Sequence, residues 1–274
     1  MGILNVTPDS FSDGGRFPAA ADAVAAGLAM AAAGAGVLDV GGESTRPRGA
    51  AYGAGAVEVT EEEEKARVLP VVEGLLRARP DLLVSVDTRR TGVASAALGA
   101  GACMVNVVTG LDAPEDLLDL VAIQGAAVVL SHCRGTPATT FAVSRFGDVV
   151  PEVAADLEAA AGRAAARGVP RDRVLLDPGL GFGKGAEENY ALLAGLDRLA
   201  PPGVPLVVGA SRKAFLGSVT GAPAPERLPE SLAACALAVA AAPLRPLLLR
   251  VHDVAETVRF LAVLARGGFP LTPP

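Results

Sequence analysis

Side chains that bind anions, amides and metal ions gather in a few short clusters of this sequence, each directly after an apolar run. The clearest clusters lie at 5–15, 39–47, 177–184, 211–213 and 250–253. A polar group just past a buried strand projects from the rim of a sheet or barrel, so several rims brought together form one composite pocket. The sequence therefore places its chemistry at the ends of strands.

Carboxylates and an amide follow four of these apolar runs. Asp177 is the preferred group for binding N–H donors of a substrate, because the Pro and Gly residues after it do not fit a first helical turn. Asp87 fits the N-cap of a following helix and a ligand-binding carboxylate equally well. Asn106 needs a partner at an otherwise apolar strand end, and a ligand amide or ring nitrogen would supply one. Asp39 is expected to point into the barrel and hold loop backbone amides.

Cations follow the last two apolar runs. Residues Ser211 to Lys213 open a predicted helix, where free backbone N–H groups and two cations favour an anion. Arg250 and His252 alternate onto the same side of a strand and can both face a phosphate. A salt bridge that closes the barrel is the alternative role for this pair.

The first cluster begins with an amide and continues as a long polar loop without helical periodicity. Asn5 could cap a turn, and it could equally supply an oxygen ligand for Mg²⁺. The loop is typical of a lid over a pocket, with a plain surface turn as the alternative. His132 has no companion His or paired carboxylate nearby in sequence, so a hydrogen-bonded structural role is expected.

Eight apolar, β-branched runs of strand length alternate with eight helix-like segments. The predicted strands are 2–6, 36–40, 82–86, 103–107, 126–130, 173–176, 205–208 and 247–251. The predicted helices are 19–33, 61–79, 91–99, 114–123, 149–167, 187–199, 229–241 and 254–266.

Strands that are apolar on both faces and alternate with helices indicate parallel pairing under a helical cover. Eight such units predict an α/β fold of the (β/α)8 TIM-barrel type, in one domain over 1–274. An open doubly wound sheet is the competing architecture. The first strand is followed by no Gly-x-Gly-x-x-Gly, and no shift in composition divides the chain.

Composition narrows the range of partners. Hydrophobic residues make up 51% and aromatic residues 4%, so the core is expected to consist of many small Ala, Val and Leu contacts. A net charge of −6 without a Lys/Arg block argues against nucleic acid. The apolar runs are too short for a bilayer span and the start does not resemble a signal peptide, which predicts a cytoplasmic protein. Three scattered cysteines and two histidines fit neither a disulfide framework nor a zinc site.

Taken together, the clusters resemble those of dihydropteroate synthases, folate-pathway enzymes that join a dihydropterin to p-aminobenzoate. The resemblance spans essentially the whole chain. It is carried by Asn-Val-Thr-Pro-Asp-Ser-Phe-Ser-Asp-Gly-Gly at 5–15, Asp-Val-Gly-Gly-Glu-Ser-Thr-Arg-Pro at 39–47, Asp-Pro-Gly-Leu-Gly-Phe-Gly-Lys at 177–184, Ser-Arg-Lys at 211–213 and Arg-Val-His-Asp at 250–253.

The resemblance implies a (β/α)8 homodimer that takes dihydropterin pyrophosphate and p-aminobenzoate, with Mg²⁺ as cofactor. The implied pterin-binding residues are Asp87, Asn106, Asp177, Phe182, Gly209, Lys213 and Arg250, the last stacking on the pterin. The implied pyrophosphate-binding residues are Asn5, which also holds the metal, Arg250 and His252. The implied p-aminobenzoate-binding residues are Phe11, Thr45, Pro47 and Ser211.

Two positions depart from the family pattern. Val107 follows the strand-four Asn where the family usually has Asp, which is expected to remove a pterin-side carboxylate and to lower affinity or activity. Ser131 stands where a Met commonly packs against the pterin, a milder loss of apolar contact.

The implied reaction breaks a C–O bond at the pterin CH₂ group and needs stabilisation of the leaving pyrophosphate more than a base. An SN1-like path without a dedicated general base is expected. Two other functions remain open: a pterin-binding paralogue with weak or no synthase activity, favoured by Val107, and a pterin-dependent methyltransferase that serves a corrinoid partner.

Overall fold

Eight parallel strands form the centre of the molecule. The structure is a computed structural model that describes residues 1–7, 16–44 and 59–269. The strands are β1 (Gly2–Asn5), β2 (Val37–Gly41), β3 (Leu83–Asp87), β4 (Met104–Val107), β5 (Ala127–Ser131), β6 (Val174–Asp177), β7 (Leu206–Val208) and β8 (Leu247–Leu249). They lie side by side in sequence order, each parallel to the next.

The sheet returns on itself, because the segment after β8 pairs with β1. Gly2 forms a parallel bridge with Val251, Ile3 N donates to Val251 O at 2.9 Å, and Val251 N donates to Met1 O at 2.9 Å. These contacts confirm the predicted (β/α)8 barrel. That residues 1–274 make a single domain stays a prediction.

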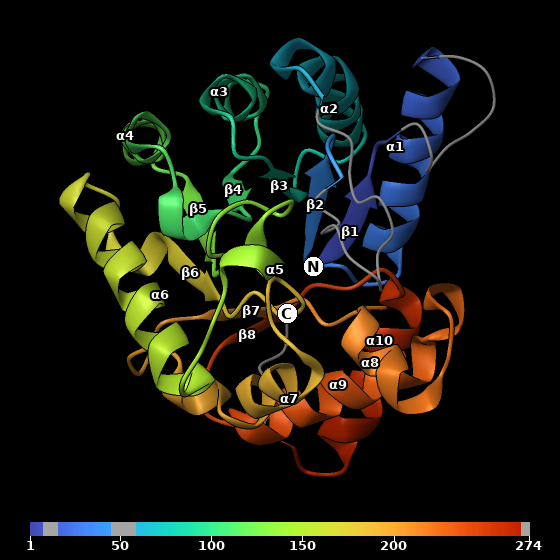
Figure 1. The fold of residues 1–274 in the computed structure, drawn as a ribbon. Coiled ribbons are helices and arrows are strands. Elements are labelled where there is room, and N and C mark those ends of the chain that lie inside the picture. Colours follow the sequence, from blue (N-terminus) through green and yellow to red (C-terminus); the bar gives the residue numbers. More distant parts are fainter. Residues whose placement is uncertain (8–15, 45–58, 270–274) are drawn as a thin grey trace.

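Helices surround the strands, as Figure 1 shows in a view along the barrel. They are α1 (Arg16–Ala32), α2 (Glu61–Ala78), α3 (Thr91–Gly99), α4 (Glu115–Gln124), α5 (Thr140–Val143), α6 (Val149–Ala166), α7 (Ala186–Ala194), α8 (Ala214–Thr220), α9 (Leu228–Ala241) and α10 (Val254–Arg266). Short 3-10 turns η1 (Gly110–Asp112), η2 (Arg171–Arg173), η3 (Leu196–Arg198) and η4 (Ala224–Glu226) lie between them.

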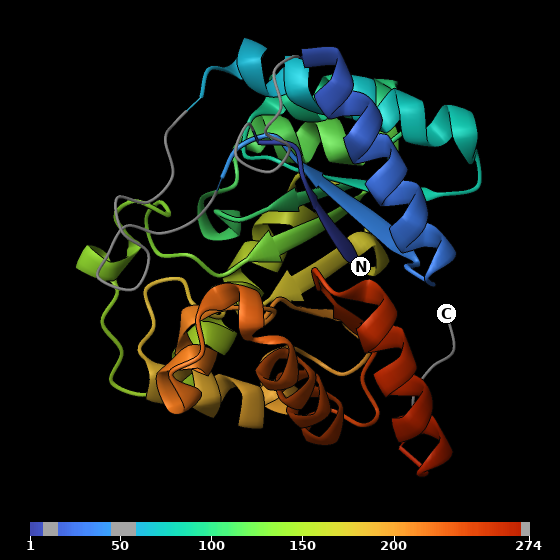
Figure 2. The same ribbon diagram turned by 90° about the vertical axis from the view of Figure 1, so that its right-hand side faces the viewer.

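The predicted elements agree with the observed ones except at a few loops. The predicted helix 187–199 is interrupted at Gly195, the C-cap of α7, and continues only as the η3 turn. The sequence did not predict α5, a single turn after β5. In the side view of Figure 2, α5 projects beyond the carboxyl ends of the strands. In the described ranges, no helix is both long and apolar enough to cross a membrane.

Strand alternation divides the interior into an apolar floor and a polar layer. Side chains of one parity join the helices in the main core, among them Val105, Val107 and Leu130. Those of the other parity point into the barrel, where Met1, Val37, Val129 and Val207 pack with Met104, Leu175 and Leu248. Two residues further along these strands stand Asp39, Asn106, Ser131, Asp177, Gly209 and Arg250. The interior of the barrel therefore changes from hydrophobic to polar over two residues of each of these strands.

The register sets neighbouring interior side chains at one level. Asn5 pairs with Gly41, Gly41 with Asp87, and Asp87 with Asn106. Each pair is one strand spacing apart, about 4.8 Å. The amide of β1 and the polar groups of β3 and β4 therefore face the same part of the barrel.

Gly110 follows β4 where the chain passes close to β5. A Cβ at this position would lie 2.5 Å from Ser131 N and 2.6 Å from Leu130 Cα, both main-chain atoms. We expect Gly110→Ala to destabilise the protein by about 1–3 kcal/mol, because the backbone of β5 would have to shift. Thermal or urea unfolding measures this change.

Gly162→Ala is the matched control. Gly162 lies inside α6, and a Cβ there would meet nothing within 4 Å. Alanine should stabilise the helix by about 0.5–1 kcal/mol. Equal effects of the two substitutions would contradict the close approach at Gly110.

Candidate active site

Arg250 crosses the mouth of the barrel to two carboxylates on distant strands. Its Nε donates to Asp39 Oδ2 at 2.6 Å and its Nη2 donates to Asp87 Oδ2 at 2.7 Å. Burial lowers the pKa of Arg250, but Asp39 and Asp87 outweigh that effect and raise it above its usual value. The alternative of a salt bridge that closes the barrel is therefore what the structure shows for this side chain.

Asp39 points into the barrel, as predicted, and its described hydrogen bonds are with side chains. The Oδ2 of this fully buried carboxylate accepts from Asn106 Nδ2 at 2.9 Å as well as from Arg250. The predicted contact with loop amides falls partly on residues outside the described ranges and stays a prediction. Because the side chain lies in the middle of β2, with its interior parity, it is below the loop and next to the neighbouring polar groups. Asp39 thus joins β2 to β4 and to the end of β8.

Asp87 is not a helix cap. The helix after it, α3, has Arg90 as its N-cap residue, without a side-chain cap. Burial raises the pKa of Asp87 to about 7, against the opposing effect of Arg250. Of the two roles left open by the sequence, the ligand-binding carboxylate remains.

Asp177, Lys213 and Gly209 surround a common space. Asp177 Oδ1 accepts from Gly179 N at 2.7 Å. A Cβ on Gly209 would lie 3.8 Å from Asp177 Oδ2 and 4.0 Å from both Lys213 Nζ and Arg250 Cβ. The absence of a side chain at position 209 therefore leaves space between Asp177, Lys213 and Arg250.

Burial also brings the pKa of the lysine in this group closer to neutral pH. It lowers the pKa of Lys213 to about 8, with Asp177 opposing the shift, and burial raises the pKa of Asp177. The Lys213 ammonium lies 4.6 Å from the centre of the Phe182 ring, a cation–π contact. Phe182 consequently lies beside the same space.

Several buried acceptors in this region have no hydrogen-bond partner among the described residues. They are Asp39 Oδ1, Asp87 Oδ1, Asn106 Oδ1 and Ser85 Oγ. Buried polar atoms are normally paired. Acceptors gathered without donors, beside a guanidinium and an ammonium, fit a ligand that carries N–H donors on one edge.

His252 and Ser211 form a hydrogen-bonded pair at the rim. Ser211 Oγ lies 3.0 Å from His252 Nδ1 and accepts from His252 N at 3.2 Å. Burial lowers the pKa of His252 to about 4, so the imidazole is neutral at pH 7. The pair offers an anion a hydrogen bond from the ring rather than a positive charge.

The predicted anion site at a helix start after β7 is wrong in its details. The helix α8 begins only at Ala214, and Arg212 N is already used as a donor to Ser231 Oγ at 2.9 Å. The Arg212 side chain pairs with Asp253, Nε to Oδ2 at 3.0 Å. The backbone at Arg212 is left-handed, with a φ of 59°.

Asn5 is placed to offer an oxygen to a metal ion. A Cβ on Gly41 would lie 3.8 Å from both Asn5 Oδ1 and Asp87 Oδ2, so this amide oxygen faces the polar layer. No cluster of three or more His, Cys, Asp or Glu residues able to hold a metal occurs in the described part. One amide oxygen fits Mg²⁺, which retains water and binds mainly through substrate phosphates.

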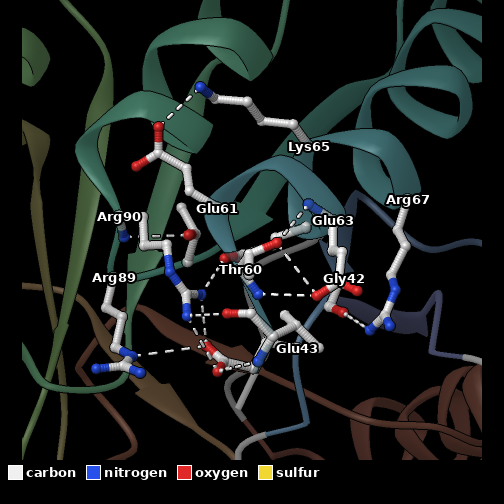
Figure 3. A network of polar contacts seen from close by, with 12 residues as sticks. Gly42, Glu43, Thr60, Glu61, Glu63, Lys65, Arg67, Arg89 and Arg90 are labelled. Carbon is white, nitrogen blue, oxygen red and sulfur yellow. Dashed lines mark hydrogen bonds and ion pairs between the residues drawn. The ribbon is translucent and has the colours of Figure 1, made fainter.

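A network of ion pairs ties together the two ends of segment 45–58 (Figure 3). Arg90 donates to Glu43 Oε2 at 2.8 Å and to Val59 O at 2.5 Å, and it also pairs with the fully buried Glu64. Arg67 Nη1 donates to Gly42 O at 2.9 Å. The predicted p-aminobenzoate residues Phe11, Thr45 and Pro47 lie outside the described residues; Ser211 is the member of that group that the structure describes.

His132 has the structural role that the sequence predicted. It is fully buried, with Nε2 3.1 Å from Asp156 Oδ2 and Nδ1 2.9 Å from Lys184 Nζ. Lys184 also donates to the carbonyls of Gly179 at 3.0 Å and Phe182 at 3.1 Å. Sequence reasoning missed this lysine as the anchor of the β6 loop, because nothing local distinguishes it from a surface residue.

Val107 does not face the polar layer. It is fully buried with the outward-facing core and pairs in register with Leu130, whereas Asn106 faces inward. The expected loss of a pterin-side carboxylate at this position is therefore wrong. Ser131, in register with Asp177, does have the inward parity.

Comparison with known proteins points to one family. The family described as pterin binding enzyme matches residues 1–252. The dihydropteroate synthase of Mycobacterium leprae is 44% identical over 268 residues, covering 96% of this chain and 91% of the relative. That of Escherichia coli K12 is 42% identical over 264 residues, covering 96% and 89%.

Solved structures show the same similarity. Dihydropteroate synthase of Xanthomonas albilineans with 4-aminobenzoic acid has a TM-score of 0.86 and 44% identity, covering 98% of this chain and 93% of that one. The same enzyme in complex with 7,8-dihydropteroate has a TM-score of 0.83 and 42% identity, covering 97% and 92%.

The ion pairs of Arg250 lead to a test of stability. Arg250→Met leaves Asp39 and Asp87 buried without their cation, so we expect a loss of about 3–5 kcal/mol at pH 8. The loss should be smaller at pH 5.5: the folded pKa of Asp87 already lies above its unfolded value, and protonation relieves the uncompensated charge. Urea unfolding at the two pH values measures the difference.

Arg245→Met is the matched control, because all four hydrogen bonds of this arginine go to main-chain carbonyls, those of Pro201, Val204, Asp197 and Ala200. Its effect on the free energy of unfolding should be nearly the same at both pH values. A pH-independent loss in the Arg250 variant would show that the carboxylates do not depend on this guanidinium.

Proposed function

The chain belongs to the pterin-binding enzyme family and is a dihydropteroate synthase, and on that premise we propose how its barrel makes 7,8-dihydropteroate. The substrates are a 6-hydroxymethyl-7,8-dihydropterin pyrophosphate and p-aminobenzoate, and pyrophosphate is released. The proposal rests above all on the acceptors of Asp87, Asn106 and Asp177, which border one space together with Arg250 and Lys213. That pattern complements a flat heterocycle with several N–H donors on one edge.

The pterin lies in the polar layer above the apolar floor. Asp87 and Asp177 accept from its N–H groups, Asn106 offers its amide oxygen, and Lys213 donates to a ring acceptor. Gly209 leaves room for the ring, with Phe182 beside it. The Arg250 guanidinium stacks on the ring face.

Pyrophosphate lies nearer the rim. Arg250 uses Nε and one N–H of Nη2 for the carboxylates, so both N–H groups of Nη1 and the second N–H of Nη2 are left as donors for a phosphate oxygen. His252 donates from its neutral ring, and Asn5 would hold Mg²⁺ against the diphosphate. When bound, the metal would neutralise charge on the leaving group.

The second substrate, p-aminobenzoate, binds between Ser211 and the loops that carry Phe11, Thr45 and Pro47. The C–O bond of the pterin CH₂ breaks first and its electron pair leaves with pyrophosphate. The ring delocalises the positive charge, and the neutral amine then forms the C–N bond and releases a proton to solvent. This SN1-like order needs no general base, in keeping with a His252 that is engaged with Ser211.

Two further properties complete the proposal. The protein forms a homodimer, a proposal supported by exposed apolar side chains on α9 and α10, namely Leu237, Val258 and Val263; sedimentation equilibrium would test it. It acts in the cytoplasm, which agrees with three free cysteines, Cys103, Cys133 and Cys235.

The methyltransferase alternative has no observation in its favour, and the inactive paralogue lost its support with the placement of Val107.

The activity is tested by mixing the protein with Mg²⁺, the dihydropterin pyrophosphate and p-aminobenzoate. We expect pyrophosphate release that depends on both substrates. Val107→Asp should not raise kcat/KM, because position 107 faces the helices. No release from the wild-type protein would refute the proposed function, whereas a gain in the variant would refute only the placement of Val107.

The pKa values of Asp87 and Lys213 predict a narrow pH optimum for pterin binding. Affinity should rise as Asp87 ionises near pH 7 and fall as Lys213 loses its proton near pH 8. Calorimetric titration with 6-hydroxymethyl-7,8-dihydropterin, which lacks the titrating pyrophosphate, measures this profile.

Two variants test which residue causes the rise and which causes the fall of affinity with pH. Asp87→Asn should remove the rise and Lys213→Arg should remove the fall, because asparagine does not titrate and arginine stays charged. If the dissociation constant of the wild-type protein does not change between pH 6 and pH 9, the assignment is wrong.

A further inference from the structure

Asp39 is a fully buried carboxylate to which the proposed reaction gives no part. It lies on β2, yet its hydrogen-bond partners come from β4 and from the end of β8. Its own Oδ1 has no partner among the described residues. A buried charge of this kind is costly to keep, and at a binding site it is better explained by what it orients than by stability alone.

The contact with Asn106 determines which end of that amide faces the ligand. A carboxylate that pairs with Arg250 can only accept, so the amide nitrogen of Asn106 has to face Asp39, at 2.9 Å. The amide oxygen then points the other way, where it is buried and without a partner among the described residues. Asn106 is consequently held as an acceptor toward the pocket.

The contact with Arg250 fixes the plane of the guanidinium. Nε is held by Asp39 at 2.6 Å and Nη2 by Asp87 at 2.7 Å, from two neighbouring strands. Two anchors on a planar fork remove its rotation. The same carboxylate oxygen of Asp39 therefore sets an acceptor of the pocket and the plane of its cation.

We infer that Asp39 is a positioning residue for the pterin. It does not touch the substrate. It holds Asn106 with its oxygen toward the ring N–H groups and keeps the Arg250 guanidinium parallel to the ring. This inference rests on the proposed function, since it concerns the same pocket and the same ligand.

The inference is tested with pterin affinity, measured by titration with 6-hydroxymethyl-7,8-dihydropterin, in variants whose unfolding midpoints are also determined. Asp39→Leu introduces a side chain of similar size and removes the Oδ2 atom that accepts from both Asn106 and Arg250. The Asn106 amide is then free to rotate and to present a donor to the ligand donors, and the Arg250 guanidinium loses one of its two anchors. We expect the dissociation constant to rise about 10- to 100-fold.

A second substitution should restore the acceptor. In Asp39→Leu with Asn106→Asp, the carboxylate at position 106 offers an oxygen to the pterin in either orientation. The total charge of the pocket is conserved. We expect an affinity at least about fivefold higher than in Asp39→Leu alone, and tighter binding than in Asn106→Asp alone, where two carboxylates meet without a donor.

Glu64→Leu is the matched control, because Glu64 is another fully buried carboxylate that pairs with an arginine, Arg90. It should leave pterin affinity unchanged even where the unfolding midpoint falls. A role for Asp39 in stability alone would lower the midpoint of Asp39→Leu and leave its affinity within about twofold of wild type, which would overturn the inference.

Two other results would also overturn it. One is an affinity loss in Asp39→Leu that persists in the double variant. The other applies if Asp39→Leu does not fold: the double variant then has to bind pterin more tightly than Asn106→Asp, and equal or weaker binding refutes the positioning role. Because these measurements need only pterin binding, they are independent of whether wild-type protein releases pyrophosphate.

Discussion

The guanidinium of Arg250, held between Asp39 and Asp87, is the interaction on which the rest of the site depends. It links the end of β8 to β2 and β3, and so it joins the first and last parts of the chain across the barrel mouth. It also opposes the effect of burial on Asp87, whose pKa burial raises to about 7. The same contacts that close the barrel therefore keep its mouth charged for a ligand.

The balance of charge in this pocket explains its chemistry. Three aspartates, Asp39, Asp87 and Asp177, face one arginine and one lysine inside a space from which water is largely excluded. Burial brings the pKa values of Asp87 and Lys213 toward one another, to about 7 and about 8. In the proposed pocket, the groups assigned to the heterocycle are thus sensitive to pH, whereas the arginine assigned to the leaving group stays charged.

Supporting contacts behind the pocket keep these groups in place. Lys184 draws together carbonyls of the β6 loop and the ring of His132, and Arg90 joins both ends of segment 45–58 to α2. Both cations also bind main-chain oxygens, so they hold the backbone of these segments in place.

The sequence by itself determined the barrel and the position of its chemistry. Strand and helix periods are local properties, and a polar residue two places after an apolar one on the same strand has to face the same interior, as with Leu175 and Asp177. That reasoning placed Asp87, Asn106, Asp177 and Arg250 correctly. The same alternation requires Val107, the residue after Asn106, to face the helices, whereas the family pattern suggested a position beside the pterin.

Only the tertiary structure decided which charges pair. Asp39 and Arg250 are separated by 211 positions, and Asn106 and Asp39 by 67, so no local period relates them. Arg212 was turned toward Asp253 by a left-handed backbone that its sequence neighbours do not demand. Partners across a barrel follow from closure and register, which are set by all eight strands together, and a short stretch of sequence does not contain them.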